Sequence, residues 1–105
     1  MAPRARHTII LVQQTPNMAS RTFYDYESLT QAMNGVCRLF EEQLKRKNPH
    51  VANITYDIND LYGYIDGIFD MSALFFNHQT NMYEPFGRDW IKDKVLQHLK
   101  RLCQQ

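Results

Sequence analysis

The chain contains a run that reads as a β-strand with apolar side chains on both of its faces, residues 7–14 (HTIILVQQ). Successive side chains of a strand point to opposite sides, so Ile9 and Leu11 share one face. Ile10 and Val12 share the other. A strand of an antiparallel sheet in a small protein usually has one solvated face and alternates in polarity. This strand therefore predicts that something covers each side of the sheet.

Length and composition indicate one globular domain. We expect a single domain over residues 1–105, in which residues 1–6 form a flexible basic arm. With 44% hydrophobic residues and a formal net charge of +1, the chain gives no electrostatic case for a general nucleic-acid binder. The apolar run after the arm is too short for a signal peptide or a membrane span. Cys37 and Cys103 lack a metal-ligand spacing, so we expect reduced thiols in an intracellular protein.

The hydrophobic pattern predicts two hairpins and three helices. Apolar residues at steps of three or four predict helices over residues 29–47, 58–69 and 90–102. Extended, aromatic-rich segments predict three further strands at residues 21–24, 71–76 and 82–86. The order of the elements is therefore ββααββα.

Polar residues mark where the helices begin. The predicted N-caps, which precede or open the apolar stripes, are Ser28, Asp57 and Asp89, with Asp25 as an alternative cap of the first helix. Gly63 and Gly67 lie inside the second predicted helix, where each costs about 1 kcal/mol relative to alanine. Either packing offsets this cost or a neighbour needs the close approach to the helix.

Two hairpins and three helices make an α+β domain, most simply a four-stranded antiparallel sheet with the three helices packed on one face. The open face then carries Ile9 and Leu11 with no element left to cover it, so we expect a second copy to pack there. Burying these two side chains on both chains contributes about 6 to 12 kcal/mol, whereas association costs about 4 to 15 kcal/mol, so further residues must join. The alternative is that a loop or helix of the same chain covers them.

The predicted dimer interface extends along two strands. It consists of residues on the first two strands: His7, Ile9, Leu11, Gln13, Thr22 and Tyr24. One parity of residues 71–76 joins them, and the pattern does not decide which.

Several short segments together resemble the enhancer of rudimentary homolog family. They occur in order along nearly the whole chain: residues 7–13 (HTIILVQ), 21–22 (RT), 25–28 (DYES), 35–37 (GVC), 44–46 (LKR), 48–49 (NP), 54–58 (ITYDI) and 89–92 (DWIK). Their colinearity carries the resemblance. It implies a small nuclear protein, with a cytoplasmic pool left open, that has no enzymatic activity and no cofactor. It also implies a four-stranded sheet backed by three helices and a homodimer through Ile9 and Leu11.

The resemblance further implies an adaptor that gathers RNA-processing factors, with links to splicing, small-RNA processing, RNA elimination and the cell cycle. Its partners would be short disordered segments of larger proteins that dock in apolar grooves. Four aromatic residues are candidates for the walls of such a groove: Phe75, Phe76, Tyr83 and Phe86.

The resemblance also implies regulation by an acidophilic kinase that needs an acidic residue three places after the acceptor. Thr22 keeps this arrangement with Asp25, whereas Ser28 is followed by Gln31. A phosphate on Thr22 would add about two negative charges to the sheet and oppose dimerisation. The loop 15–20 lacks the glycine and the basic residues expected in the family. One explanation is that the chain is a paralogue with a narrower set of partners.

Two other classes of function are alternatives to the adaptor. A direct RNA-binding protein would use the basic outer face of the last helix, formed by Lys92, Lys94, His98, Lys100 and Arg101. Its affinity would fall steeply with salt. A small enzyme has no site to recommend it, because the histidines share no metal-ligand spacing and no nucleophile motif occurs.

Overall fold

The computed structural model describes residues 7–103, which form a four-stranded antiparallel sheet and three helices. The elements in chain order are β1 (Thr8–Gln13), a short 3₁₀ helix η1 (Met18–Ser20), β2 (Arg21–Tyr26), α1 (Leu29–Lys47), α2 (Ile58–Gly67), β3 (Asp70–Asn77), β4 (Met82–Phe86) and α3 (Arg88–Cys103). The predicted order ββααββα is confirmed. The predicted basic arm, residues 1–6, lies outside the described residues.

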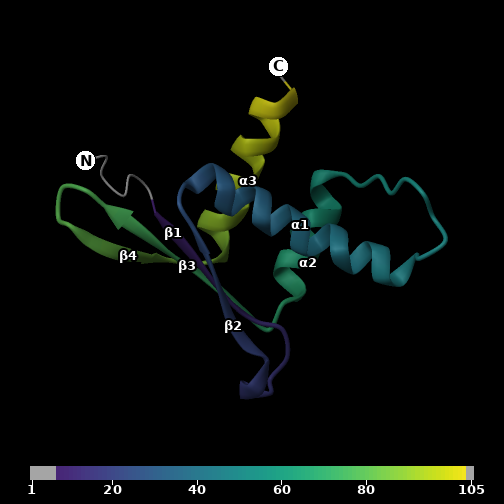
Figure 1. Ribbon diagram of the computed structural model, residues 1–105, viewed down its shortest axis with the longest axis horizontal. Coiled ribbons are helices and arrows are strands. Elements are labelled where there is room, and N and C mark those ends of the chain that lie inside the picture. The colour runs from purple at the N-terminus through teal and green to yellow at the C-terminus, as the bar shows by residue number, and fades with distance from the viewer. Residues whose placement is uncertain (1–6, 104–105) are drawn as a thin grey trace.

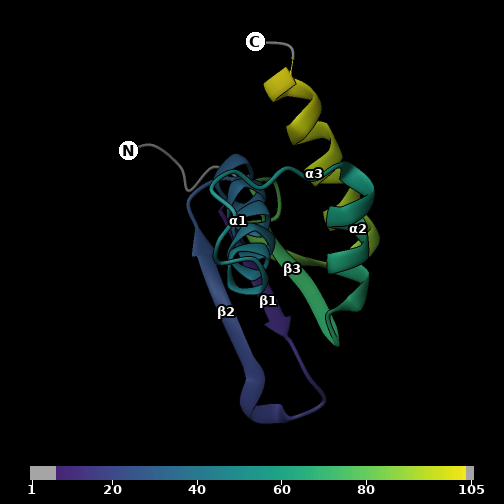
Figure 2. The same cartoon turned by 90° about the vertical axis from the view of Figure 1, so that its right-hand side faces the viewer.

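The sheet has the strand order β2-β1-β3-β4, with every neighbouring pair antiparallel (Figure 1). Ile10 aligns with Tyr24 on β2 and with Ala73 on β3. Ile10 and Ala73 are fully buried, which identifies their parity as the face beneath the helices. α1 lies against β1 and β2, and α3 against β3 and β4. α2 packs beside α3 and also contacts α1 (Figure 2).

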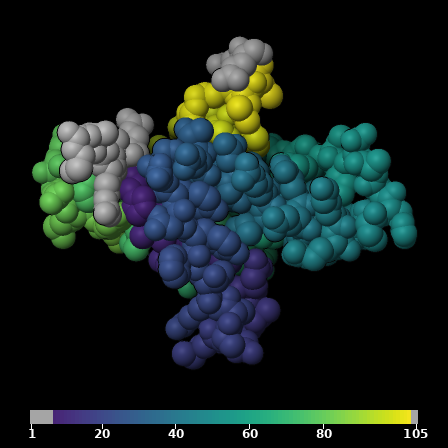
Figure 3. Space-filling view, in the orientation of Figure 1, coloured from purple at the N-terminus to yellow at the C-terminus, as the bar shows by residue number. Residues whose placement is uncertain are grey.

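The helices and the covered face of the sheet share one hydrophobic core. Its largest fully buried apolar side chains are Ile10, Met33, Val36, Leu61, Ile65, Ile91 and Val95. All but Ile10, which lies on β1, belong to the predicted apolar stripes of the helices, so the amphipathic pattern identifies the helix faces that pack on the sheet. The β1–β2 hairpin and the segment after α1 project from this body in different directions (Figure 3).

The first two helices begin at the predicted caps. The Ser28 hydroxyl oxygen accepts a hydrogen bond from the backbone N–H of Gln31 at 3.1 Å. The Asp57 carboxylate accepts from the N–H of Asp60 at 2.9 Å, and the Asp60 carboxylate accepts from the N–H of Asp57 at 3.0 Å. This reciprocal capping box satisfies donors that the first turn of α2 leaves unpaired.

The third helix begins two residues earlier than predicted, at residue 88 instead of residue 90. α3 starts at Arg88, and the backbone N–H of Ile91 donates to the carbonyl of Gly87 at 3.2 Å. Asp89 therefore lies in the first turn instead of at the N-cap. Its carboxylate there complements the positive end of the helix dipole.

Arg88 also accounts for the end of α2, which stops at Gly67 and not at residue 69 as predicted. Its guanidinium donates to the carbonyl oxygens of Ile65 at 3.1 Å, Asp66 at 3.0 Å and Phe69 at 2.6 Å. Carbonyls in the last turn of a helix have no partner within the helix. Arg88 supplies one, and it thereby ties the end of α2 to the start of α3.

His98 joins α3 to α1 inside the core. The side chain is only 2% exposed, and its Nε2 lies 2.6 Å from the side-chain oxygen of Asn34. Burial, assisted by the positive charge of Arg101, lowers the pKa of His98. The folded protein therefore holds this imidazole neutral.

This burial predicts a loss of stability in mild acid. Below about pH 6.5 the unfolded chain binds a proton at this histidine before the folded protein does, so the free energy of unfolding falls as the pH decreases, by at most about 1.4 kcal/mol per pH unit. Urea denaturation at about pH 7.5 and about pH 5.5 measures the loss. We expect His98→Gln to show a smaller loss between these pH values, whereas His50→Gln, at an exposed position, should match the wild type. An unchanged loss in His98→Gln would contradict this assignment.

Candidate functional site

The face of the sheet opposite the helices carries an apolar strip across three strands. On this open face Ile9 aligns with Leu74 of β3, and Leu11 aligns with Phe23 of β2. Phe23 is 64% exposed, and the other three side chains are partly exposed. Since α1 and α3 pack on the opposite face, the strip stays accessible to a partner. The residues of β3 on the open face are therefore Ser72, Leu74 and Phe76. The sequence pattern did not decide which alternate residues of this strand face outward.

Polar side chains frame this apolar strip at both ends. At one end the His7 ring hydrogen-bonds to the Tyr83 hydroxyl through Nδ1 and to the Asp25 carboxylate through Nε2. At the other end Arg21 donates through Nε to the side-chain oxygen of Gln13 at 2.9 Å. An apolar centre with a polar rim is the usual arrangement of a protein–protein interface.

The predicted interface residues divide between the two faces of the sheet. Four of them lie on the open face: His7, Ile9, Leu11 and Gln13. Gln13 is nevertheless buried, and its side chain is already hydrogen-bonded to Thr15 and Arg21. Thr22 and Tyr24 align with Val12 and Ile10 and so share the helix-covered parity. The prediction that these two residues share a face with Ile9 and Leu11 is wrong. The register of the hairpin instead turns Phe23 and Asp25 toward the open face.

Thr22, the predicted phosphorylation site, has an exposed side chain on β2. Because it aligns with Val12, a phosphate there would project from the side opposite the apolar strip. Such a phosphate would therefore not enter the interface, contrary to the expectation that it opposes dimerisation there. Phosphorylation itself stays a prediction.

An aromatic pocket of about 520 Å³ opens between β3, β4 and α3. We define it by its lining residues: Leu29, Phe75, Phe76, Asn77, His78, Gln79, Glu84, Phe86, Trp90 and Lys94. Three of the four predicted groove residues, Phe75, Phe76 and Phe86, are brought together here. Tyr83 does not line this pocket. It pairs with Phe76 on the open face, and the two ring centroids lie 5.2 Å apart.

The sequence pattern did not predict that Trp90 contributes to this aromatic pocket. In the sequence it only flanks the apolar stripe of the last helix. Its ring stacks on Phe86 with centroids 4.6 Å apart and meets Phe75 at 5.6 Å. The Lys94 ammonium lies 5.9 Å from the centre of the indole ring. The pocket thus combines an aromatic wall with a cation at its edge.

The basic face predicted on the last helix is shorter than its sequence indicates. The Lys92 ammonium lies 3.0 Å from an Asp66 carboxylate oxygen and 5.0 Å from the centre of the Tyr62 ring. With His98 buried, only Lys100 and Arg101 of the predicted set are exposed. Two exposed cations give a weak electrostatic basis for binding a polyanion.

Residues 7–103 also bear on metal binding and on membrane insertion. That part of the chain contains no group of three or more histidine, cysteine, aspartate or glutamate side chains able to hold a metal ion. None of its helices is both long and apolar enough to cross a membrane.

The two thiols differ in burial. Cys37 is buried, and burial together with the nearby Glu41 carboxylate raises its pKa to about 11, whereas Cys103 is exposed. Because the thiolate is the reactive form, we expect a thiol reagent at about pH 8 to modify Cys103 quickly and Cys37 only on unfolding. Mass spectrometry after timed labelling measures this. Rapid labelling of folded Cys103→Ser protein would contradict the burial of Cys37.

The chain is similar to known proteins along nearly its whole length. Residues 4–105 match the family model described as enhancer of rudimentary. The enhancer of rudimentary homolog of Arabidopsis thaliana is 54% identical over 99 residues, which cover 94% of this chain and 91% of the relative. The homolog of Dictyostelium discoideum is 46% identical, with 93% and 98% covered. The protein enhancer of rudimentary of Drosophila virilis is 48% identical, with 85% and 86% covered.

Proposed function

Because this chain belongs to the enhancer of rudimentary family, we propose that it acts as a homodimeric, non-enzymatic adaptor in the nucleus. In this proposal the dimer binds short segments of larger proteins and so gathers components of RNA-processing complexes, among them those of splicing, small-RNA processing or RNA elimination. A link to the cell cycle is part of the same proposal.

The observation that supports dimerisation is the uncovered apolar strip of the open face. Four apolar side chains of this strip contact water in a monomer: Ile9, Leu11, Phe23 and Leu74. Full burial of an exposed side chain of this kind stabilises a complex by about 1.5 to 3 kcal/mol. Two copies that pack face to face bury eight such side chains. The gross gain is at most about 12 to 24 kcal/mol, since three of the four side chains are already partly buried, and it is of the same order as the cost of association, about 4 to 15 kcal/mol.

The aromatic pocket supports the binding of partner segments. Flexible segments lose conformational entropy when they bind, so their affinity depends on a few anchoring side chains in apolar pockets. The wall formed by Phe75, Phe86 and Trp90 offers such an anchor point. Because each copy carries one pocket, a dimer could hold two segments at once and gain avidity.

Affinity purification followed by mass spectrometry tests the adaptor. We expect tagged wild-type protein to retain RNA-processing proteins at moderate salt and after nuclease treatment. Phe86→Ser, which shortens the aromatic wall, should lose the same set, whereas Gln97→Ser on the exposed side of α3 should not. Retention that disappears with nuclease, or with Lys100→Ala and Arg101→Ala, would favour direct RNA binding and overturn the proposal.

A further inference from the structure

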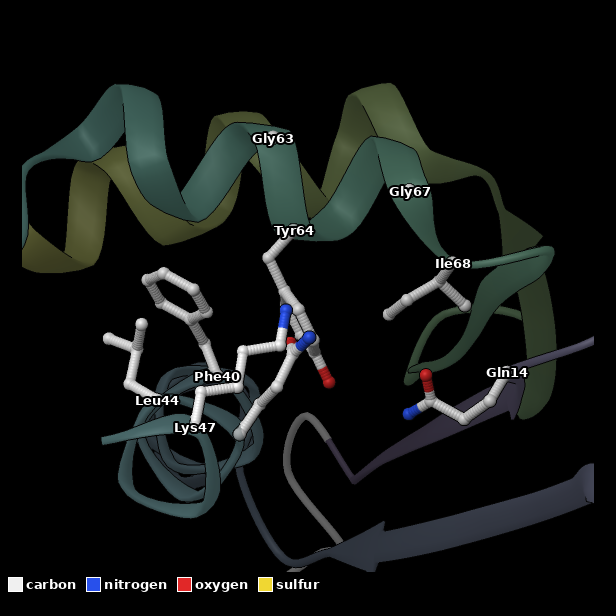
Figure 4. Close-up of a pocket in the computed structure, with 9 residues that line it drawn as sticks. Gln14, Phe40, Leu44, Lys47, Gly63, Tyr64, Gly67 and Ile68 are labelled. Carbon is white, nitrogen blue, oxygen red and sulfur yellow. The ribbon is translucent and has the colours of Figure 1, made fainter. Parts of the chain in front are cut away.

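A second cavity, distinct from the open face and the aromatic pocket, lies between α1 and α2 (Figure 4). It has a volume of about 330 Å³, and we call it the α1–α2 groove. Its lining residues are Gln14, Phe40, Gln43, Leu44, Lys47, Gly63, Tyr64, Gly67 and Ile68. In Figure 4 the side chains of Phe40, Leu44 and Lys47 rise from α1, and that of Tyr64 reaches toward them from α2.

The two glycines of α2 lie along this groove one helical turn apart. A methyl group added at Gly63 or at Gly67 would meet no atom within 4 Å. Neighbouring elements in the described chain therefore do not need the close approach, although each glycine costs about 1 kcal/mol of helix stability relative to alanine. Their effect is to leave room for an occupant against the backbone of α2.

The polar side chains of the groove point to the chemistry of that occupant. The side-chain oxygen of Gln43 is buried and, among the described residues, has no hydrogen-bond partner. A buried acceptor without a donor is costly, so it favours an occupant that brings an N–H group. Lys47 is the charged residue of the lining, and the lining includes no carboxylate. The groove therefore favours an occupant that also carries a negative charge.

We propose that the α1–α2 groove binds an extended peptide segment in which an aspartate or glutamate adjoins an apolar residue. The carboxylate pairs with the Lys47 ammonium, and a backbone N–H of the segment donates to the Gln43 side-chain oxygen. The apolar residue packs on Phe40, Leu44 and Ile68. This site is independent of the proposed adaptor pocket, because the two cavities share no lining residue.

The same features argue against a phosphate-bearing ligand. Phosphate groups carry no N–H donor for the Gln43 oxygen, and their sites usually combine several cations or backbone N–H groups. The groove offers one lysine. The Tyr64 ring is already packed on Phe40, with centroids 5.2 Å apart, so it is not a free platform for a nucleic-acid base.

Blocked tripeptides test the proposal by nuclear magnetic resonance on the full chain. We expect a leucine–aspartate–leucine peptide to shift the backbone amide signals of Gly63 and Gly67 and the side-chain amide signals of Gln43. The matching leucine–asparagine–leucine peptide should bind about fivefold more weakly, because it lacks the charge that Lys47 pairs with. Lys47→Gln should remove this difference while leaving the asparagine peptide unaffected.

Filling the groove provides the second variant. Gly63→Leu with Gly67→Leu should abolish the shifts. Leucine favours helices, and a Cβ atom at either position meets no atom of a neighbouring element within 4 Å, so the fold should persist. Asn59→Leu adds the same side chain to an exposed position of α2 outside the groove and should bind normally. Peptide shifts outside the groove, equal binding of the two peptides, or equally tight binding of acetate or inorganic phosphate alone would overturn the proposal.

Discussion

Replacing Ile9 and Leu11 together by arginine should reduce the mass in solution from that of two chains to that of one. The variant would place four cations in a face-to-face interface, and burying an unpaired charge costs several kcal/mol. We therefore expect the proposed dimer to weaken by more than about a thousandfold. Both positions lie on the open face, so the core beneath the helices should stay intact. Sedimentation equilibrium gives the mass, and circular dichroism reports the fold.

Single arginine variants on β2 test which parity of that strand joins the interface. Phe23→Arg should weaken the dimer, because Phe23 aligns with Leu11 on the open face. Thr22→Arg is the matched control, since Thr22 is exposed on the other side of the sheet, and it should leave the mass unchanged. A dimer that survives both arginines at Ile9 and Leu11 would show that the copies meet elsewhere.

The apolar run of β1 was enough to predict that both faces of the sheet are apolar, because successive side chains of a strand point to opposite faces. The three helices could cover only one of these faces, so the other was predicted to be open. The parity of β2 was not predictable in the same way. Phe23 and Tyr24 are adjacent aromatics, so either one satisfies an apolar face. Their assignment depends on the register set by the loop between β1 and β2, which contains the 3₁₀ turn Met18–Ser20. A register shift by one residue exchanges the two faces.

The aromatic pocket was predictable in part for a related reason. Phe75 and Phe86 were named from their residue type, but the surface they form needs Trp90, which reaches it from the next element. Tyr83 was grouped with them by type, although it has the opposite parity to Phe86 on β4. Residue type identifies candidates for such a site, whereas the pairing of strands and the docking of a helix decide which of them meet.

The end of α2 depends on a contact that no local pattern indicates. A single arginine at the start of α3 reads as exposed surface, yet Arg88 donates to three carbonyls more than eighteen residues earlier in the chain. Hydrogen bonds from a charged donor contribute about 1.5 to 3 kcal/mol each when isolated. Because the site is partly open to water and one side chain makes all three bonds, we expect Arg88→Ala to lower the free energy of unfolding by about 2 to 4 kcal/mol.

The lysine variant separates geometry from charge at this position. Arg88→Lys keeps the positive charge but replaces the planar guanidinium, whose two nitrogens donate in different directions, by a single ammonium group. This group cannot donate to all three carbonyls, so the lysine variant should restore less than half of the stability lost in Arg88→Ala. Arg38→Ala, at an exposed position of α1, should change stability by no more than about 0.5 kcal/mol. Urea denaturation gives these values, and amide hydrogen exchange locates the effect. If α2 exchanges no faster than α1 in Arg88→Ala, the guanidinium does not hold the end of α2, because removing a cap should first loosen the helix that it caps.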